Sequence, residues 1–417
     1  MRVILLGSGG REHAIAAALA ADPAVTDLIV APGNPGTAAI ATNAEVDALD
    51  PDVVAALAVE LAADLVVVGP EAPLVAGVAD AVRAKGIACF GPSQAAAQLE
   101  GSKAFAKDVM RAAGVPTARS FVCTSAAELA EALDAFGAPY VVKDDGLAAG
   151  KGVVVTDSRD EALAHGAACE RVVVEEYLAG PEVSLFVVTD GTAAVPLQPA
   201  QDFKRIGDGD AGPNTGGMGA YSPLPWAPEG LVDQVMATVV QPTLAEMRHR
   251  GTPFSGVLYV GLALTADGPK VIEYNCRFGD PETQVVLARL ETPLAGILHA
   301  AAVGRLAEDP PLAWRPGSAV CVVMASAGYP ESARKGDVIT GADGVPGVIH
   351  AGTARRADGA LVTAGGRVLT CTATGDTLAE ARAAAYRLVD GVTFDGEQHR
   401  TDIALAALQD TVVIPAK

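Results

Sequence analysis

Aromatic residues are scarce in this chain: they account for 4% of its 417 residues, and only two of them are tryptophan. A buried core must therefore consist mainly of valine, leucine, isoleucine and alanine, since hydrophobic residues still make up 50% of the sequence. A chain of this length has room for about two to four domains of roughly 100–200 residues each. Alternating strand and helix patterns in such a composition favour an α/β architecture.

Basic residues are also few. Lysine and arginine together number 30 against 50 aspartates and glutamates, which leaves a formal net charge of −20 at pH 7. Nucleic-acid-binding surfaces carry a basic patch or stripe, so this balance argues against nucleic acid as a partner. Small anionic substrates are compatible with it, because a few lysines and glycine N–H groups can bind them locally.

The chain lacks the cysteine, histidine and apolar patterns of several other protein classes. Its six cysteines form no C-x-x-C pair and its six histidines form no H-E-x-x-H motif, so we expect neither a disulfide scaffold nor a zinc site. Only four apolar residues follow Arg2 before a glycine, which is too short for a signal-peptide core. No run reaches the roughly 18 apolar residues of a membrane helix. We therefore expect a soluble, cytoplasmic protein without membrane contacts.

What the chain does contain is a strand, a glycine turn and a helix at its start. Residues 3–6 are a continuous apolar run, G-S-G-G occupies residues 7–10, and a helical pattern covers residues 11–21. The dinucleotide fingerprint G-x-G-x-x-G is incomplete, because Glu12 stands at its third glycine. The pattern predicts an anion site at a helix N-terminus, with Arg11 adding positive charge; a solvated Arg11 is the alternative.

The same alternation continues to about residue 113. Its strands end in glycine- and proline-rich loops, where ligands of open α/β sheets bind, so residues 33–37 and 70–71 are candidate substrate loops or simple turns. Lys103 and Lys107 lie four apart on one helix, a spacing that is typical of a solvated face. The expected strands are residues 28–30, 65–68 and 87–90, and the expected helices are residues 52–63, 76–85 and 102–113.

A glycine-rich loop lies between two valine-rich runs in the middle of the chain. Residues 141–156 read V-V-K-D-D-G-L-A-A-G-K-G-V-V-V-T, with Lys143 and Lys151 beside the glycines. Glycine lets backbone N–H groups approach an anion closely, and lysine adds positive charge. A P-loop is excluded, because three residues rather than four separate Gly146 from Gly150 and a strand pattern follows. The stretch predicts a hairpin lid over phosphates; an ordinary hairpin is the alternative.

Two further stretches can complete a nucleotide site. A strand at residues 172–178 runs into a turn before a strand at residues 183–188, which offers backbone groups and Glu182 to an adenosine. Glu273 and Asn275 are separated by one residue on an expected strand, so both side chains point to one face. Such an oxygen pair suits Mg²⁺, and an exposed strand face is the alternative.

The remaining patterns indicate a long helix and a small final domain. Residues 231–250 read as one helix, interrupted or bent near Pro242. From about residue 312 the chain shows short strands and one amphipathic helix without a dense charge cluster. This pattern predicts an α+β domain that docks on the rest of the protein or caps it. Its expected strands are residues 318–324, 338–339, 348–350 and 366–371, and its expected helix is residues 377–388.

Seven motifs, taken in order, resemble the ATP-grasp superfamily and, within it, the phosphoribosylamine–glycine ligase family. Each motif alone is weakly specific, whereas their order along almost the whole chain is highly specific. The motifs are G-S-G-G-R-E-H-A (7–14), A-P-G-N-P-G-T (31–37), G-P-E-A-P-L-V (69–75), E-G-S-K (100–103), D-G-L-A-A-G-K-G-V (145–153), G-P-N-T-G-G-M-G-A-Y-S-P (212–223) and E-Y-N-C-R-F-G-D-P-E-T (273–283).

The resemblance implies an α/β and α+β multidomain protein with an ATP-grasp fold. A Rossmann-like phosphoribosylamine domain would span residues 1–100, the ATP-grasp domain 101–311 with a mobile lid at about 119–183, and the α+β domain 312–417. The implied reaction joins glycine to 5-phosphoribosylamine through glycyl phosphate, giving glycinamide ribonucleotide, ADP and phosphate in purine biosynthesis. ATP would be a substrate, Mg²⁺ or Mn²⁺ the cofactor, and the protein a monomer.

The resemblance also assigns roles to individual residues. ATP would be bound by Lys103, Lys143, Gly146, Gly150, Lys151, Gly152, Glu175, Glu176, Leu178 and Glu182. The other substrates would be contacted by Gly9, Gly10, Arg11, Asn34, Gly36, Thr37, Glu71, Asn214, Thr215 and Gly216. Arg277 would pair with the glycine carboxylate or the acyl phosphate, while Asp280 and Asp202 would hold its ammonium group. Glu273 and Asn275 would bind the metal ion.

The chain departs from the family pattern in three places. Asp144 replaces the alanine of K-A-D, and its charge would oppose phosphate binding unless strand alternation turns it away. Residues 157–171, between the lid loop and the hinge, form a shorter segment than expected. The strand at residues 255–264 has no carboxylate for a metal ion, which leaves more of the coordination to Glu273 and Asn275.

Three other functions stay open from the sequence. An NAD-dependent oxidoreductase is disfavoured by Glu12, which interrupts the dinucleotide fingerprint. An ATP-grasp ligase for a different carboxylate would share the nucleotide site but not the N-terminal loops. A non-catalytic nucleotide-binding protein is disfavoured by Lys143, Glu273, Asn275 and Arg277, which are all present.

Overall fold

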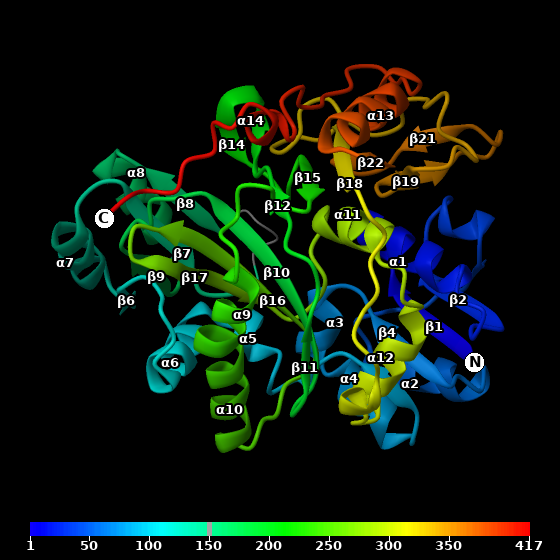
Figure 1. Cartoon of the computed structure of the whole chain (residues 1–417), viewed down its shortest axis with the longest axis horizontal. Coiled ribbons are helices and arrows are strands. Elements are labelled where there is room, and N and C mark those ends of the chain that lie inside the picture. Colours follow the sequence, from blue (N-terminus) through cyan, green and yellow to red (C-terminus); the bar gives the residue numbers. More distant parts are fainter. Residues whose placement is uncertain (148–151) are drawn as a thin grey trace.

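The computed structural model describes residues 1–147 and 152–417, and Figure 1 shows them as sheets flanked by helices. The N-terminal part is a parallel sheet in the order β3-β2-β1-β4-β5. This confirms the expected α/β opening. Its elements are β1 (Arg2–Gly7), α1 (Gly10–Ala20), β2 (Asp27–Pro32), η1 (Thr37–Ala39), β3 (Thr42–Asn43), α2 (Pro51–Glu60), β4 (Leu65–Val68), α3 (Glu71–Ala76), α4 (Val78–Ala84) and β5 (Ala88–Phe90).

The local sequence explains most of these elements. Strands β1 and β4 are buried along nearly their whole length, as expected for a parallel sheet covered on both faces. Helix α2 starts directly after Asp50, whose carboxylate accepts hydrogen bonds from the N–H groups of Asp52 at 3.0 Å and Val53 at 3.2 Å. The short helix α3 was not expected, so Glu71 begins a helix instead of lying in a loop.

The middle of the chain forms a four-stranded antiparallel sheet, β6-β9-β7-β8, packed against α7 and α8. We call these six elements the lid subdomain. Lys143 on β7 lies opposite Val153 on β8, which confirms the expected strand–loop–strand arrangement. The elements of this region are α5 (Gln98–Gly101), α6 (Lys103–Ala113), β6 (Ser120–Cys123), α7 (Ala126–Phe136), β7 (Tyr140–Asp144), β8 (Val153–Thr156), α8 (Arg159–Ala167) and β9 (Val172–Glu175).

A second antiparallel sheet, β11-β10-β16-β17, lies beside the lid subdomain (Figure 1). The long helix expected around Pro242 is present as α9 and α10, joined by the π-helical turn η3 (Met236–Val240). A π turn is wider than an α turn, and such turns commonly accompany a bend. The elements are β10 (Glu182–Asp190), β11 (Ala194–Pro196), α9 (Leu231–Val235), α10 (Gln241–His249), β16 (Ser255–Thr265), β17 (Gly268–Asn275), α11 (Glu282–Arg289) and α12 (Leu294–Ala302).

The last sheet has the order β12-β15-β18-β22-β19 and crosses residue 312, because β12 and β15 precede that position. Val338 forms only an isolated bridge with Val362, so the strand expected at residues 338–339 is wrong. Helix α13 packs on β18 and β22. The elements are β12 (Gln201–Asp202), β13 (Arg205–Gly207), η2 (Asp208–Asp210), β14 (Ala211–Asn214), β15 (Gly219–Ser222), η4 (Leu306–Glu308), β18 (Ser318–Ala325), β19 (Val348–His350), β20 (Thr353–Arg355), β21 (Leu361–Thr363), β22 (Arg367–Gly375), α13 (Leu378–Asp390) and α14 (Leu405–Leu408).

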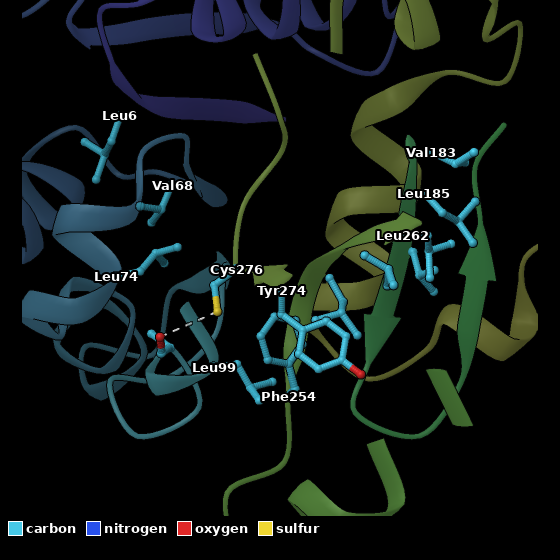
Figure 2. Packing of buried hydrophobic residues seen from close by; sticks show 14 of the residues in the cluster. Leu6, Val68, Leu74, Leu99, Val183, Leu185, Phe254, Leu262, Tyr274 and Cys276 are labelled. Atoms are coloured by element: carbon cyan, nitrogen blue, oxygen red, sulfur yellow. Dashed lines mark hydrogen bonds between the residues drawn. The ribbon is translucent and has the colours of Figure 1, made fainter. Parts of the chain in front are cut away.

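One continuous core joins the N-terminal sheet to the second sheet (Figure 2). Leu6 on β1 belongs to the same buried cluster as Leu185 on β10 and Leu262 on β16. Cys276 lies between the two sides, and its thiol donates a hydrogen bond to Ala97 O at 3.6 Å. The segment after β17 is therefore fixed at the junction of both sheets. No helix of the described ranges is long and apolar enough to cross a membrane.

Candidate active site

The end of β17 carries the two residues predicted to bind a metal ion. Glu273 and Asn275 lie on one side of this strand, whereas Tyr274 between them is buried in the core. Burial opposes the ionisation of Glu273, but neighbouring cations lower its pKa below the usual value. Those cations are Lys204, Lys143, Lys103 and Arg277. The arrangement therefore holds an ionised carboxylate among four cationic side chains.

Carboxylate and amide oxygens are donors that Mg²⁺ prefers, so Glu273 and Asn275 fit this ion. Strand β16 adds no carboxylate beside them, as its sequence indicated. Among residues 1–147 and 152–417, no group of three or more His, Cys, Asp or Glu side chains is arranged to hold a metal ion. An ion at this pair would therefore complete its coordination with nucleotide phosphates and water.

The two lysines predicted to bind phosphates lie close to this pair. Lys143 on β7 is buried, and its ammonium group contacts Glu175 Oε2 and Ile272 O, both at 2.9 Å. Lys103 at the start of α6 donates to Gly146 O at 2.9 Å, where the glycine-rich loop begins. Both lysines thus connect the lid strand and loop to the rest of the molecule.

The glycine-rich loop is described only at its two ends. Gly146 stands at one end, and Gly152 at the other accepts a hydrogen bond from Asp144 N at 2.7 Å. Gly150 and Lys151, for which the family resemblance implies a role in ATP binding, lie outside the described residues. The pairing of β7 with β8 still places both ends of the loop next to Lys143.

Asp144 lies on the face of β7 opposite Lys143, whereas Asp145 contacts the start of α6. Asp144 follows Lys143 on β7, so strand alternation turns its side chain to the other face. On that face lies Cys169, whose thiol pKa is raised first by burial and then by the charge of Asp144. Asp145 pairs with Arg171 and accepts hydrogen bonds from Ser102 Oγ and Ala104 N, both at 3.1 Å. Asp144, the extra carboxylate relative to the family pattern, therefore points away from the face that carries Lys143.

The predicted hinge lies at the end of β9. The Glu175 carboxylate is buried between Lys143 and Lys107, at 2.9 and 3.1 Å. Glu176 is bound to Arg119 through both its backbone N–H, at 3.0 Å, and its carboxylate, at 2.6 Å. Leu178 is half-buried beyond this point. The side chains of Glu175 and Glu176 are thus both paired with cations.

A second charged group surrounds Asp202 on β12. Burial raises the pKa of Asp202 to about 8, and the carboxylates of Glu282, Glu182 and Glu273 add to the shift, whereas Lys204 opposes it. Burial alone would lower the pKa of Lys204, but Glu182 and Asp202 raise it well above its ordinary value. Lys204 also forms an ion pair with Glu182. The predicted ribose ligand and the predicted ammonium ligand therefore share one lysine.

Arg277, predicted to contact glycine, connects β17 to the N-terminal domain. Its guanidinium pairs with Glu100 Oε1 at 3.0 Å and Glu71 Oε2 at 3.2 Å, and it donates to Asn275 Oδ1 at 3.2 Å. Burial opposes its charge, but Glu100 and Glu71 raise the pKa of Arg277 above its ordinary value. Glu71, for which the family resemblance implies a contact with a substrate, is an ion-pair partner of Arg277 in this structure.

The glycine turn before α1 is built around Glu12. Its Oε2 accepts a hydrogen bond from Gly9 N at 2.7 Å, and its Oε1 accepts one from Arg11 Nε at 2.5 Å. Arg11 is only 8% exposed and also donates to Phe278 O at 3.0 Å, so the solvated alternative is wrong. Gly10 starts the helix. Glu12 thus fills the space that a third fingerprint glycine would leave open.

The loop with Asn34, Gly36 and Thr37 is held by its own side chains. Asn34 Oδ1 accepts hydrogen bonds from Gly36 N at 2.8 Å and Thr37 N at 3.0 Å. Asn34 Nδ2 donates to Ser8 O at 2.8 Å and to His350 O at 3.0 Å. These side chains fix the loop against the turn before α1 and against β19. The polar groups of Asn34 are therefore used to hold the loop itself.

The C-terminal sheet reaches the site through Arg367 at the start of β22. Arg367 pairs with Asp280 Oδ2 at 3.0 Å and donates to Gly216 O at 2.7 Å. Burial opposes the ionisation of Asp280, but Arg367 and then Arg11 lower its pKa. Of the other loop residues, Thr215 donates to Lys204 O at 2.8 Å and Asn214 pairs with Arg205 in the β13–β14 ladder.

Four charged residues of the site were not predicted. Glu100 belongs to the motif E-G-S-K, and Lys204 to the charge-dense segment at residues 201–205, so both left a signal in the sequence. Lys107 is 8% exposed, which makes the expected solvated face wrong. Arg367 left no signal, because it stands 87 residues from Asp280 in a region without a charge cluster.

This fold and this cation-rich site define an ATP-grasp protein. A family model described as phosphoribosylglycinamide synthetase, ATP-grasp (A) domain, matches residues 101–283. Models described as the N domain and the C domain of the same synthetase match residues 1–100 and 319–406. The chain therefore belongs to the phosphoribosylglycinamide synthetase family.

Individual proteins agree with this membership. Phosphoribosylamine–glycine ligase of Streptomyces coelicolor is 66% identical over 414 residues, which covers 98% of this chain and 99% of that protein. The ligase of Mycobacterium tuberculosis is 57% identical over 423 residues, covering 99% and 100%. The crystal structure of the Thermotoga maritima ligase has a TM-score of 0.85 and 37% identity, covering 97% of this chain and 100% of that chain. The oxidoreductase alternative is wrong.

Proposed function

We propose that this chain joins glycine to 5-phosphoribosylamine in an ATP-driven step of purine biosynthesis, giving glycinamide ribonucleotide, ADP and phosphate. The observation that carries the proposal is the oxygen pair Glu273 and Asn275, set among lysines and Arg277, in a member of this family. An ionised carboxylate among cations is what a metal–polyphosphate complex requires, since the complex contributes both signs of charge.

ATP would lie between the lid subdomain and β17. Lys103 and Lys143 would bind its phosphates, because both ammonium groups act on Glu273. Gly146 and Gly152 flank the loop that would cover the phosphates, with Gly150 and Lys151 between them. The backbone from Glu175 to Leu178 would hold adenine, and Glu182 the ribose. Mg²⁺ or Mn²⁺ at Glu273 and Asn275 would neutralise phosphate charge.

Glycine would lie between Arg277 and the carboxylates of Asp280 and Asp202. A guanidinium suits its carboxylate, and the ionised Asp280 suits its ammonium group; a bound ammonium would also favour the ionised form of Asp202, whose pKa burial raises to about 8. A glycine carboxylate oxygen attacks the γ-phosphorus, the bond to the ADP oxygen breaks, and glycyl phosphate forms. The amine of phosphoribosylamine then attacks the carbonyl carbon, phosphate leaves, and the amine loses a proton. Positioning and stabilisation of developing negative charge by Arg277 would accelerate both steps.

Phosphoribosylamine would lie at the N-terminus of α1. The first N–H groups of a helix favour an anion, and the buried Arg11 adds charge beside them. This position faces Asp280 and the C-terminal sheet, because a Cβ on Gly10 would lie 3.6 Å from Asp280 Oδ1 and 3.4 Å from the Cβ of Ala351. The residues that would frame the pocket are Gly9, Gly10, Arg11, Asn34, Gly36, Thr37, Glu71, Asn214, Thr215 and Gly216.

Phosphate release from MgATP tests this function directly. The assay uses glycine and freshly generated phosphoribosylamine, and omits each substrate in turn. We expect release to require glycine, and product to form only when the amine is also present. Release that is independent of glycine would contradict the proposed reaction. Replacing glycine with alanine or β-alanine separates this ligase from one that acts on a different carboxylate.

We further propose that the enzyme works as a monomer in the cytoplasm on these three small molecules. The six free cysteines, five of them buried, support a reducing compartment. The net charge of −20 supports the absence of nucleic acid as a partner. Sedimentation of the purified protein would test the monomer.

A further inference from the structure

Lys107 on α6 is a buried cation beside the nucleotide site, and the mechanism proposed above does not use it. It is 8% exposed. Its ammonium group contacts Glu175 Oε1 at 3.1 Å and donates to Thr117 Oγ1 and Ala118 O, both at 2.9 Å. An ammonium has three N–H donors, so these partners use all of them. Lys107 therefore has no donor left for a phosphate.

Glu175 divides its carboxylate between two lysines. Oε1 faces Lys107 at 3.1 Å, and Oε2 faces Lys143 at 2.9 Å. All three side chains are buried, so their charges interact strongly. Within residues 1–147 and 152–417, Lys143 has two acceptors, Glu175 and Ile272 O, which leaves one of its three N–H donors for a ligand.

The same three side chains join the lid subdomain to the rest of the molecule. Glu175 and Lys143 belong to β9 and β7 of the lid subdomain, whereas Lys107 belongs to α6 outside it (Figure 1). Thr117, a partner of Lys107, lies on the segment that enters the lid subdomain and donates to Val271 O on β17 at 2.6 Å. The position of Lys143 relative to β17 therefore depends on this buried group.

We propose that Lys107 is a positioning residue for ATP, which shares the Glu175 carboxylate so that Lys143 keeps a free N–H and its charge for the phosphates. The inference rests on the proposed role of Lys143. With Lys107 present, the three side chains carry two positive charges and one negative charge. Without it, Glu175 neutralises Lys143 alone, and the attraction for a polyphosphate weakens.

Steady-state kinetics of four variants test this role. Lys107→Met is expected to raise KM for MgATP about ten-fold, and KM for glycine by less than about two-fold, as for the loss of one charge-assisted contact. Adding Glu175→Gln is expected to bring KM for MgATP back to within about three-fold of wild type, because Lys143 regains an unshared charge. Arg111→Met is the matched control, since Arg111 lies on the same helix with its side chain 81% exposed. Lys143→Met reports on the ATP site itself.

The outcomes distinguish a positioning role of Lys107 from a purely structural one. If Lys107 only stabilises the fold, the double variant is worse than Lys107→Met and KM for MgATP does not change, which would overturn the proposal. If Lys143→Met raises KM for MgATP while Lys107→Met does not, this inference alone fails. If Lys143→Met has no effect, the proposed ATP site fails with it.

A second measurement covers a Lys107→Met protein that does not fold. Burial lowers the pKa of Lys107 to about 8, against the opposing charge of Glu175. The groups that face it are Glu175, Glu176, Lys143, Thr117 and Ala118 O. Lys107 is therefore charged below this pH and neutral above it. Between about pH 7 and about pH 9, KM for MgATP of wild type is expected to rise relative to that of the single variant Glu175→Gln, which keeps Lys107 but has no carboxylate for two lysines to share. Parallel profiles would overturn the proposal.

Discussion

Replacement of Glu273 by glutamine tests the metal assignment most directly. Glutamine keeps the shape and one oxygen of the side chain but removes its charge. Burial works against that charge in the native protein, yet Lys204 and Lys143, followed by Lys103 and Arg277, keep the pKa of Glu273 low. The substitution therefore leaves a metal ion with two neutral amide ligands, among cations that are no longer balanced.

Loss of the Glu273 charge should weaken the binding of the metal ion but should not weaken the binding of metal-free ATP. Residues that only orient a metal ligand already contribute about 10–100-fold to metal affinity, so the loss of a charged ligand should cost at least about 100-fold, or about 2.7 kcal/mol. Activity at limiting Mg²⁺ should fall by that factor. Metal-free ATP should bind at least as tightly as to wild type, because the lysines around Glu273 are no longer neutralised.

Phosphate release is measured against Mg²⁺ concentration, and ATP binding by calorimetry with a chelator present. Glu246→Gln is a matched control, because Glu246 on α10 also pairs with a cation, Arg250, at 2.7 Å but is not among the residues assigned to the site. The folded-state pKa of Glu273 is lowered, so its ionised form stabilises the fold above its ordinary value of 4.5, and this contribution is lost as pH falls. Glu273→Gln should thus lower Tm more at neutral than at acidic pH. Wild-type turnover at limiting Mg²⁺ would refute the metal role.

Three further predictions concern the rest of the site. Arg367→Met should raise KM for glycine about ten-fold in steady-state assays and leave KM for MgATP unchanged, because Asp280 loses its partner at 3.0 Å; an unchanged KM for glycine would contradict this. Folded Asp202 has a pKa of about 8 against an ordinary 3.8, so native protein binds a proton that unfolded chain releases, and stability falls as pH rises between these values. Asp202→Asn should flatten the dependence of Tm on pH in thermal denaturation, and an unaltered dependence would argue against a raised pKa of Asp202. In Gly36→Ala the new Cβ would lie 2.2 Å from Cε1 of His13, so urea unfolding should show a loss of about 1–3 kcal/mol; wild-type stability would show that the loop yields.

Elements whose boundaries depend on neighbouring residues could be predicted from the sequence. Strand β4 occupies the expected residues 65–68, because a continuous valine run is a local signal. Helix α3 was missed, since its six residues are too few for a periodic pattern. The pairing of β15 with β18 was also missed, because partners so distant in the chain leave no local pattern.

The same distinction applies to the candidate site. Strand alternation placed Glu273 and Asn275 on one face of β17, and it turned Asp144 away from Lys143. Lys107 was misjudged, because its spacing from Lys103 suits an exposed helix face as well as a buried one. Only the tertiary contact with Glu175 distinguishes the two cases.

The domain that the sequence describes as docking or capping contributes to the proposed glycine site. Asp202 lies on β12, which is the edge strand of the C-terminal sheet. Asp280 is held by Arg367, which starts β22 of that same sheet. Both predicted partners of the glycine ammonium group therefore depend on one sheet that crosses residue 312. The proposed phosphate ligands Lys143 and Lys103 belong instead to the lid subdomain and to α6. Loss of the C-terminal sheet should thus impair glycine use while ATP binding persists.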